Sequence, residues 1–279
     1  MEDLFTDKFL RKLQSLAQEK SHEYQTNAPF PNIYLDEFLP VNVVEAALRE
    51  FPERTRVRWT EFDDHNQVKL AFDTTEKLPP PIRDILYFLN SRPMMEFLEV
   101  LTGISGVIPD PYFYGGGLHQ IVPGGYLEVH ADFNRHEKLR LDRRLNLLLY
   151  LNQDWKEDYG GHLELWNREM TGSVRKILPI FNRCAIFSTT DTSFHGHPEP
   201  LACPPGRTRK SIATYYYSNG RPESEVSDGH TTLFQHRPGV AKHPVNVAKH
   251  PVNVKTVIRA ITPPILLDAA RRLRRTKIG

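Results

Sequence analysis

Short apolar or alternating runs, separated by glycine, proline and asparagine, divide the sequence from residue 107 to residue 218. No helical pattern long enough for a crossover connection lies between these runs, which excludes a parallel sheet built from βαβ units. Runs of this length and spacing are typical of an antiparallel sandwich or jelly roll. The predicted strands cover residues 117–122, 126–132, 144–151, 161–166, 176–180, 184–188 and 210–218.

The N-terminal region has a different pattern of apolar residues. Apolar side chains recur there every three or four residues, which is typical of amphipathic helices. Prolines open the last of these helical stretches and a glycine closes it. The predicted elements are helices over residues 3–20, 43–51 and 81–102, of which the last is the longest, and a short strand over 32–35.

These patterns together predict an α+β chain built on a double-stranded β-helix, or jelly-roll, core. We expect residues 107–218 to form that core and residues 1–106 to form a mainly helical region that packs on it and supports it. Residues 219–279 are expected to form a C-terminal extension.

The C-terminal extension contains two unusual segments. Residues 241–247, Ala-Lys-His-Pro-Val-Asn-Val, are repeated at once as residues 248–254. Two copies are too few for a solenoid, so we expect a local duplication on the surface. A metal site at His243 and His250 is disfavoured because each lies beside a proline with no acid nearby. The arginines of residues 271–275 predict a basic terminal helix with a solvated face.

The amino-acid composition limits the kinds of binding partner and the cellular compartment that this chain is expected to have. Lys and Arg number 36 against 34 Asp and Glu, which is too balanced for a surface that binds nucleic acid. There are two cysteines, and Cys184 lies in an apolar run, as expected of a buried thiol in a reducing compartment. The start of the chain is acidic and no apolar stretch approaches the about 18 residues of a membrane span. We therefore expect a cytoplasmic protein without a membrane partner.

A candidate metal site rests on His130-Ala131-Asp132, which is followed by His195 and Arg209. Side chains two residues apart on a strand point to the same face, so His130 and Asp132 can share one ion. Two imidazoles and one carboxylate match the ligand set of non-haem Fe(II) oxygenases. His197 would share a face with His195, so spacing alone does not choose between them.

Both parts of this constellation have a simpler interpretation. A lone His-x-Asp pair is weak evidence in a chain with 12 histidines, because such pairs arise by chance. In that interpretation His130 and Asp132 are two polar side chains on the solvent-exposed face of a strand. Arg209 opens a strongly β-prone run, and a guanidinium buried there needs a carboxylate. Either a dicarboxylate co-substrate or an internal acid such as Glu164 would meet that need.

The segment from Arg144 to Ser218 resembles the prolyl 4-hydroxylase-type branch of the 2-oxoglutarate/Fe(II) dioxygenases, and the whole resemblance spans about residues 107–218. Three motifs carry it. They are Tyr-Leu-Asn-Gln-Asp-Trp at residues 150–155, Gly-Gly-His-Leu at 160–163, and Phe-Asn-Arg at 181–183 followed by an apolar strand.

The resemblance implies a jelly roll whose iron ligands are His130, Asp132 and His195, the last by an ungapped count from the Phe-Asn-Arg motif. It implies that Arg209 and Tyr150 bind 2-oxoglutarate. Leu163 and Ser211 are further expected residues of the co-substrate pocket. The implied cofactors are Fe(II), 2-oxoglutarate and O2, with ascorbate as a candidate reductant. The family's tyrosine on the strand before His-x-Asp is replaced near His119-Gln120.

The resemblance implies an enzyme that hydroxylates an unactivated C–H bond and releases succinate and CO2. The substrate would be a prolyl residue, a free amino acid or another small aliphatic molecule. Desaturation, cyclisation or epimerisation at the same iron is an alternative, and so is a non-catalytic β-sandwich module with a structural metal. Basic residues of the loop 133–144 either meet an anionic substrate or belong to a solvated turn. They are Arg135, His136, Arg140, Arg143 and Arg144.

Overall fold

Two antiparallel sheets form the centre of the computed structural model, which describes residues 2–74, 77–241 and 243. The larger sheet contains, in spatial order, β1 (Asn32–Leu35), β10 (Cys184–Ser188), β7 (Asp142–Tyr150), β12 (Arg209–Ser218), β5 (Gly117–Ile121), β3 (Val68–Phe72) and β2 (Thr60–Asp63), and β4 (Ile108–Pro109) pairs with β12. The smaller sheet contains β13 (Leu233–Phe234), β6 (Leu127–Ala131), β11 (His195–His197), β8 (Leu163–Trp166) and β9 (Ser173–Ile177). The expected antiparallel jelly-roll architecture is confirmed.

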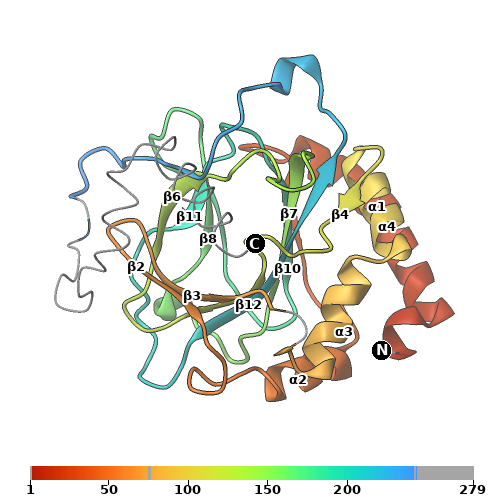
Figure 1. The fold of residues 1–279 in the computed structure, drawn as a ribbon, viewed down its shortest axis with the longest axis horizontal. Coiled ribbons are helices and arrows are strands. Elements are labelled where there is room, and N and C mark those ends of the chain that lie inside the picture. Colours follow the sequence, from red (N-terminus) through yellow and green to blue (C-terminus); the bar gives the residue numbers. More distant parts are fainter. Residues whose placement is uncertain (1, 75–76, 242, 244–279) are drawn as a thin grey trace, which may run out of the picture. The chain divides into compact units, whose positions relative to one another are not determined.

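The helices lie on one face of the larger sheet. They are η1 (Glu2–Phe5), α1 (Asp7–Thr26), α2 (Val41–Arg49), α3 (Pro80–Leu89) and α4 (Arg92–Thr102), with the short turns η3 (Glu157–Tyr159) and η4 (Glu223–Glu225) elsewhere. Figure 1 shows α1, α3 and α4 together on the side of β7 and β10 that is away from β6, β8 and β11. The Tyr24 hydroxyl of α1 lies 2.8 Å from the Ser188 hydroxyl at the end of β10.

Alternation along the central strands separates the two environments of the larger sheet. Leu145, Leu147 and Leu149 of β7 point to the helices and are fully buried there. Asn146, Leu148 and Tyr150 of the same strand point to the smaller sheet instead. Burial of each leucine stabilises the fold by about 1.5–3 kcal/mol, so the helical layer fixes which face of β7 lines the interior.

The strands predicted over residues 107–218 are all present. Strand β10 has the predicted bounds, the bounds of the others are shifted, and β9 has the largest shift. The single helix predicted over residues 81–102 is wrong, because α3 and α4 are separate helices and α1 is the longest described helix with 20 residues. Pro93 has no N–H with which to bond the carbonyl of Leu89 four residues earlier. That carbonyl accepts a hydrogen bond from the Tyr216 hydroxyl over 2.9 Å instead.

The β2–β3 hairpin was not predicted from the sequence. Leu70 and Phe72 of β3 are buried in the core beneath the helices, whereas Lys69 and Ala71 are half-buried on the opposite face. A strand of five residues carries too few alternations to stand out in a region that otherwise reads as helical.

The C-terminal extension is described only in part. Strand β13 pairs with β6, and Arg237 forms ion pairs with Glu128 and Glu199. Of the duplicated heptapeptide (241–254), only Ala241 and His243 belong to the described residues, and the predicted basic terminal helix lies outside them. Among the described helices, none has both the length and the apolar composition needed to cross a bilayer.

Candidate active site

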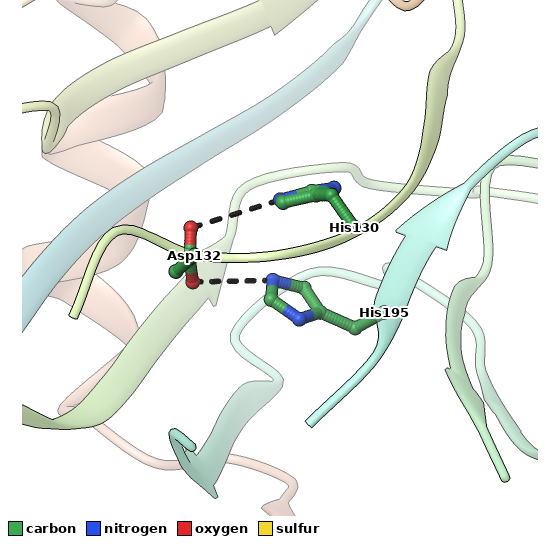
Figure 2. Close-up of side chains that lie close together, drawn as sticks. All are labelled: His130, Asp132 and His195. Carbon is green, nitrogen blue, oxygen red and sulfur yellow. Dashed lines mark ion pairs between the residues drawn. The ribbon is translucent and has the colours of Figure 1, made fainter. Parts of the chain in front are cut away.

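His130, Asp132 and His195 converge between the two sheets. His130 lies on β6, Asp132 follows that strand directly, and His195 lies on β11 opposite His130 in the strand register. Asp132 Oδ1 is 3.7 Å from His130 Nε2, and Asp132 Oδ2 is 3.3 Å from His195 Nε2, as Figure 2 shows. One potential ligand atom from each side chain lies within 4.8 Å of the other two. Such a cluster has the donor set and compactness of a divalent metal site.

Backbone carbonyls orient both imidazoles. The Nδ1–H of His130 donates to the Glu128 carbonyl over 2.8 Å, and that of His195 donates to the Ser193 carbonyl over 2.9 Å. This assignment places the unprotonated Nε2 of each ring toward Asp132. Burial and the neighbouring His195 lower the pKa of His130, which favours the neutral ring that a metal requires. Two nitrogen lone pairs that face a carboxylate in a buried site fit a cation.

Asp132 is held by residues from the opposite sheet. Its Oδ2 accepts a hydrogen bond from Asn146 Nδ2 over 2.7 Å and lies 3.0 Å from an Arg143 guanidinium nitrogen. Burial alone would raise the pKa of Asp132, but Arg143 and His195 hold that pKa well below its usual value. The carboxylate is therefore ionised and fixed in orientation.

Arg143 has a structural environment that the sequence did not indicate. Its side chain is 1% exposed and lies over the rings of Tyr215 and Phe133, at 3.5 and 4.3 Å from the ring centroids. His136 is also 1% exposed and lies 3.4 Å from Asp110. Arg143 and His136 are therefore not part of a solvated turn, which was one of the two expectations for this loop, and both have partners within the chain.

The two histidines of β11 have different surroundings. His195 belongs to the cluster, whereas His197 pairs with Leu127 after a shift in the strand register. Its Nδ1 is buried and lacks a hydrogen-bond partner among the described residues. Gly196 lies between the two histidines, and a Cβ atom at this position would lie 2.8 Å from the Leu127 carbonyl oxygen. A glycine at this position lets β11 lie close against β6.

A cavity of about 80 Å³ is lined by the cluster and by three of the four residues expected to bind a co-substrate, and the fourth, Tyr150, lies outside its lining. Arg209, Leu163 and Ser211 line it together with His130, Asp132 and His195. Tyr150 is fully buried beside Arg209, and its hydroxyl accepts a hydrogen bond from the guanidinium over 3.4 Å. The strand β12 brings Arg209 and Ser211 to the same face, two residues apart.

Arg209 lacks the internal acid that was considered as its partner. Its Nε donates to the Gly161 carbonyl over 2.7 Å, and the side chain is 5% exposed. Glu164 instead lies 2.7 Å from Lys176 Nζ. No carboxylate of the described residues forms an ion pair with Arg209. A buried, unpaired guanidinium is costly, so its environment fits an anionic ligand.

The sequence did not point to Lys69, Asn146 or Phe234 as residues of this site. Lys69 of β3 lines the same cavity, as does His119 of β5, and Asn146 and the loop residue Arg143 hold Asp132. Burial lowers the pKa of His119 to about 3, and the positive charge of Lys69 adds to this effect. The ring of Phe234, on β13, lies 5.5 Å from the ring of His130. No local signal in the sequence marked Lys69, because the five residues of β3 carry too few alternations to predict a strand.

Comparison with known proteins gives one family match and several structural neighbours. Residues 116–217 match the sequence profile of the 2OG-Fe(II) oxygenase superfamily. A prolyl hydroxylase from Trichoplax adhaerens, in complex with a hypoxia inducible factor peptide fragment, is 19% identical with a TM-score of 0.57, over 78% of this chain and 96% of that one.

Two other solved structures have similar scores. A prolyl-4-hydroxylase from Pseudomonas putida is 16% identical with a TM-score of 0.51, over 73% of this chain and 99% of that one. HygX from Streptomyces hygroscopicus, with nickel and 2-oxoglutarate bound, is 10% identical with a TM-score of 0.51, over 77% of this chain and 96% of that one. At these identities the likeness is one of fold.

Proposed function

We propose that this chain is a 2-oxoglutarate- and Fe(II)-dependent dioxygenase of the prolyl 4-hydroxylase-like type that hydroxylates an unactivated C–H bond of a small aliphatic substrate. In this proposal His130, Asp132 and His195 hold the Fe(II). Arg209 and Tyr150 bind the far carboxylate of 2-oxoglutarate, and Leu163 and Ser211 line the pocket around it. Succinate and CO2 are the co-products.

The observation that carries the proposal is the unpaired Arg209 guanidinium in the same cavity as the His-Asp-His cluster. A structural metal alone, as in a binding module, gives no reason to bury a cation next to the metal site. A dianionic co-substrate that chelates the metal at one end and pairs with Arg209 at the other end supplies the reason. The His-Asp-His cluster would then bind the metal, and Arg209 would bind the co-substrate that chelates it.

Bound Fe(II) and 2-oxoglutarate supply the oxidising chemistry with O2. The chain's own residues position these groups. The carbonyls of Glu128 and Ser193 keep each imidazole turned with Nε2 toward the metal, and Asn146 fixes Asp132. Arg209 and Tyr150 orient the co-substrate, and the apolar Leu163 side chain excludes water beside it.

The test is an anaerobic titration of the protein with Fe(II) and then with 2-oxoglutarate, followed by visible absorption. We expect a metal-to-ligand charge-transfer band that forms only when both are present. The Arg209→Ala variant should require far more 2-oxoglutarate to form the same band. Absence of the band in a folded wild-type protein that binds metal would contradict the proposal and favour a structural metal.

The substrate class proposed here is a prolyl residue, a free amino acid or another small aliphatic molecule. Mass spectrometry of the product separates hydroxylation from its alternatives. Hydroxylation adds one oxygen atom, desaturation or cyclisation removes two hydrogen atoms, and epimerisation leaves the mass unchanged. We expect the gain of one oxygen atom.

We place the enzyme in the cytoplasm. Cys184 and Cys203 are both buried free thiols, which supports a reducing compartment. Expression of a tagged full-length chain followed by cell fractionation tests this placement. Recovery of the protein from an oxidising compartment would contradict it.

A further inference from the structure

A second cavity, of about 360 Å³, adjoins the candidate metal site. It shares six residues with the smaller cavity that contains Arg209, and these are Lys69, His119, Leu127, His130, Asp132 and Tyr215. Because Arg209 lies only in the smaller cavity, the larger one is the natural place for the molecule that is oxidised. We call it the substrate groove.

The β2–β3 hairpin forms one wall of the substrate groove. Thr60 lies opposite Ala71, and Phe62 lies opposite Lys69, in the register of the two strands. All four residues line the groove, as expected for opposed pairs on one face of a hairpin. The alternate residues of β3 are buried on the other side in the helical core. Packing of the hairpin therefore forces the Lys69 side chain into the groove.

Lys69 carries a positive charge that the chain does not neutralise locally. Its Nζ lies 5.1 Å from the centroid of the Phe62 ring, and the side chain is half-buried. No carboxylate of the described residues lies within ion-pair distance of it. Burial lowers the pKa of Lys69, and Asp132 opposes that effect from a distance. A half-buried ammonium group without an ion-pair partner would be stabilised by a negatively charged group of a bound ligand.

The other charges of the two cavities have partners or an assigned role. Arg143 and Asp132 form an ion pair with each other. Arg209 is assigned to the far carboxylate of 2-oxoglutarate. Asp73 also lines the groove, but it is exposed to solvent. Lys69 is the remaining cation that both cavities share.

We propose that Lys69 binds a carboxylate of the substrate, so that the enzyme acts on a small amino-acid-like molecule with a free carboxylate. This inference rests on the proposed function and narrows its substrate class. An internal prolyl residue of a peptide offers only neutral amide carbonyls, which do not offset the ammonium charge. The aromatic side chains of the groove would pack against the aliphatic part of the substrate. They are Phe62, Tyr114, Phe133, Tyr215 and Phe234.

The experiment measures the conversion of 2-oxoglutarate to succinate in the presence of the proteinogenic L-amino acids, their carboxamides and terminally blocked proline peptides. Each amino acid and its carboxamide form a matched pair that differs in the charge at one group. We expect stimulation by at least one free acid and a KM for its carboxamide that is higher by about tenfold to a hundredfold. Blocked peptides are expected to be inactive.

Two variants assign the effect to Lys69. Lys69→Met should raise the KM for the free acid by a similar factor and leave the KM for the carboxamide nearly unchanged. Lys8→Met removes an exposed lysine of α1 that lines neither of these two cavities, and it controls for the loss of one charge. The affinity for 2-oxoglutarate, read from the anaerobic charge-transfer band, should stay the same in both variants.

Four results would overturn the inference. The first is a preference for neutral carboxamides or blocked peptides, and the second is no stimulation by any carboxylate of the panel. The third is an unchanged KM for the free acid in Lys69→Met. The fourth is a weakened 2-oxoglutarate band in Lys69→Met, which would assign Lys69 to the co-substrate. Failure of the proposed function itself is distinguishable, because the wild-type protein would then form no band.

Discussion

Asn146 Nδ2 donates a hydrogen bond to Asp132 Oδ2 over 2.7 Å, and this contact joins the two sheets at the candidate metal centre. Asn146 belongs to β7 of the larger sheet, whereas Asp132 follows β6 of the smaller sheet. The amide fixes the direction of one carboxylate oxygen, which leaves the other oxygen to face His130. Residues that orient a metal ligand in this way tune metal affinity.

Asn146→Ala should therefore weaken Fe(II) binding by about tenfold to a hundredfold without unfolding the protein. Anaerobic equilibrium titration with Fe(II) measures the change. Asn42→Ala is the matched control, because Asn42 is exposed and its side chain donates a hydrogen bond to Asp3 near the N-terminus. Equal affinities of the Asn146→Ala variant and the wild type would show that Asp132 needs no support from β7.

Replacement of the two histidines of β11 should have different results. His195→Ala should abolish Fe(II) binding, because His195 Nε2 faces Asp132. His197→Ala should retain most of it, because His197 lies outside the cluster. Metal analysis of both variants after reconstitution and desalting measures the difference. Loss of metal from His197→Ala with retention in His195→Ala would reverse the ligand assignment.

Arg209→Ala should raise the concentration of 2-oxoglutarate needed for half-maximal charge transfer by about a hundredfold, since a buried charged contact is lost. Fe(II) affinity should not change. Arg207→Ala controls for the loss of one arginine near the same strand, because Arg207 bonds the Gln153 carbonyl instead.

A monocarboxylic 2-oxo acid that lacks the far carboxylate sharpens the Arg209 test. Wild type and Arg209→Ala should bind this analogue with similar affinity, because the group that Arg209 is proposed to hold is missing. If Arg209→Ala weakens the analogue as much as it weakens 2-oxoglutarate, Arg209 supports the pocket without contacting that carboxylate.

The stability of the metal-free protein should depend on pH through His119. Its folded pKa is about 3, below the usual value of 6.5 that applies to the unfolded chain. Between these values the unfolded state binds the extra proton, so acidification favours unfolding by up to about 1.4 kcal/mol per pH unit from this group. The loss begins as the pH falls through the unfolded pKa and is complete below the folded one.

His119→Gln should lose this contribution and be less sensitive to acid than the wild type. Urea unfolding of both proteins in the presence of a chelator, at about pH 5 and about pH 7, measures the two free-energy differences. Parallel pH profiles for the two proteins would contradict the depressed pKa. His22→Gln is a control because His22 lies on the exposed part of α1.

Tyr216→Phe should destabilise the protein by about 1–3 kcal/mol, because it leaves the buried Leu89 carbonyl without its hydrogen bond at the junction of α3 and α4. Tyr87→Phe on α3 is the matched control, since Tyr87 is 48% exposed. Urea unfolding of both variants measures the difference. A change in Tyr216→Phe no larger than that in Tyr87→Phe would mean that the junction does not depend on this bond.

Features that depend on residues close together in the sequence were predictable from it. Alternation along β7 divides its side chains between the helical core and the interior between the two sheets, and short apolar runs of this kind made the core strands predictable. The His-x-Asp spacing likewise places His130 and Asp132 on one face, because successive side chains of a strand alternate. Pro93 is also a local signal for the boundary between α3 and α4.

Contacts between residues far apart in the sequence follow from the way the two sheets pack. Asn146 and Arg143 reach Asp132 because β7 and β6 belong to opposed sheets, and Lys69 enters the groove because β3 pairs with β5. Glu164 pairs with Lys176 of the adjacent strand and leaves Arg209 without an acid. Strand register and sheet packing set these contacts, and the spacing of residues along a single strand specifies neither of them.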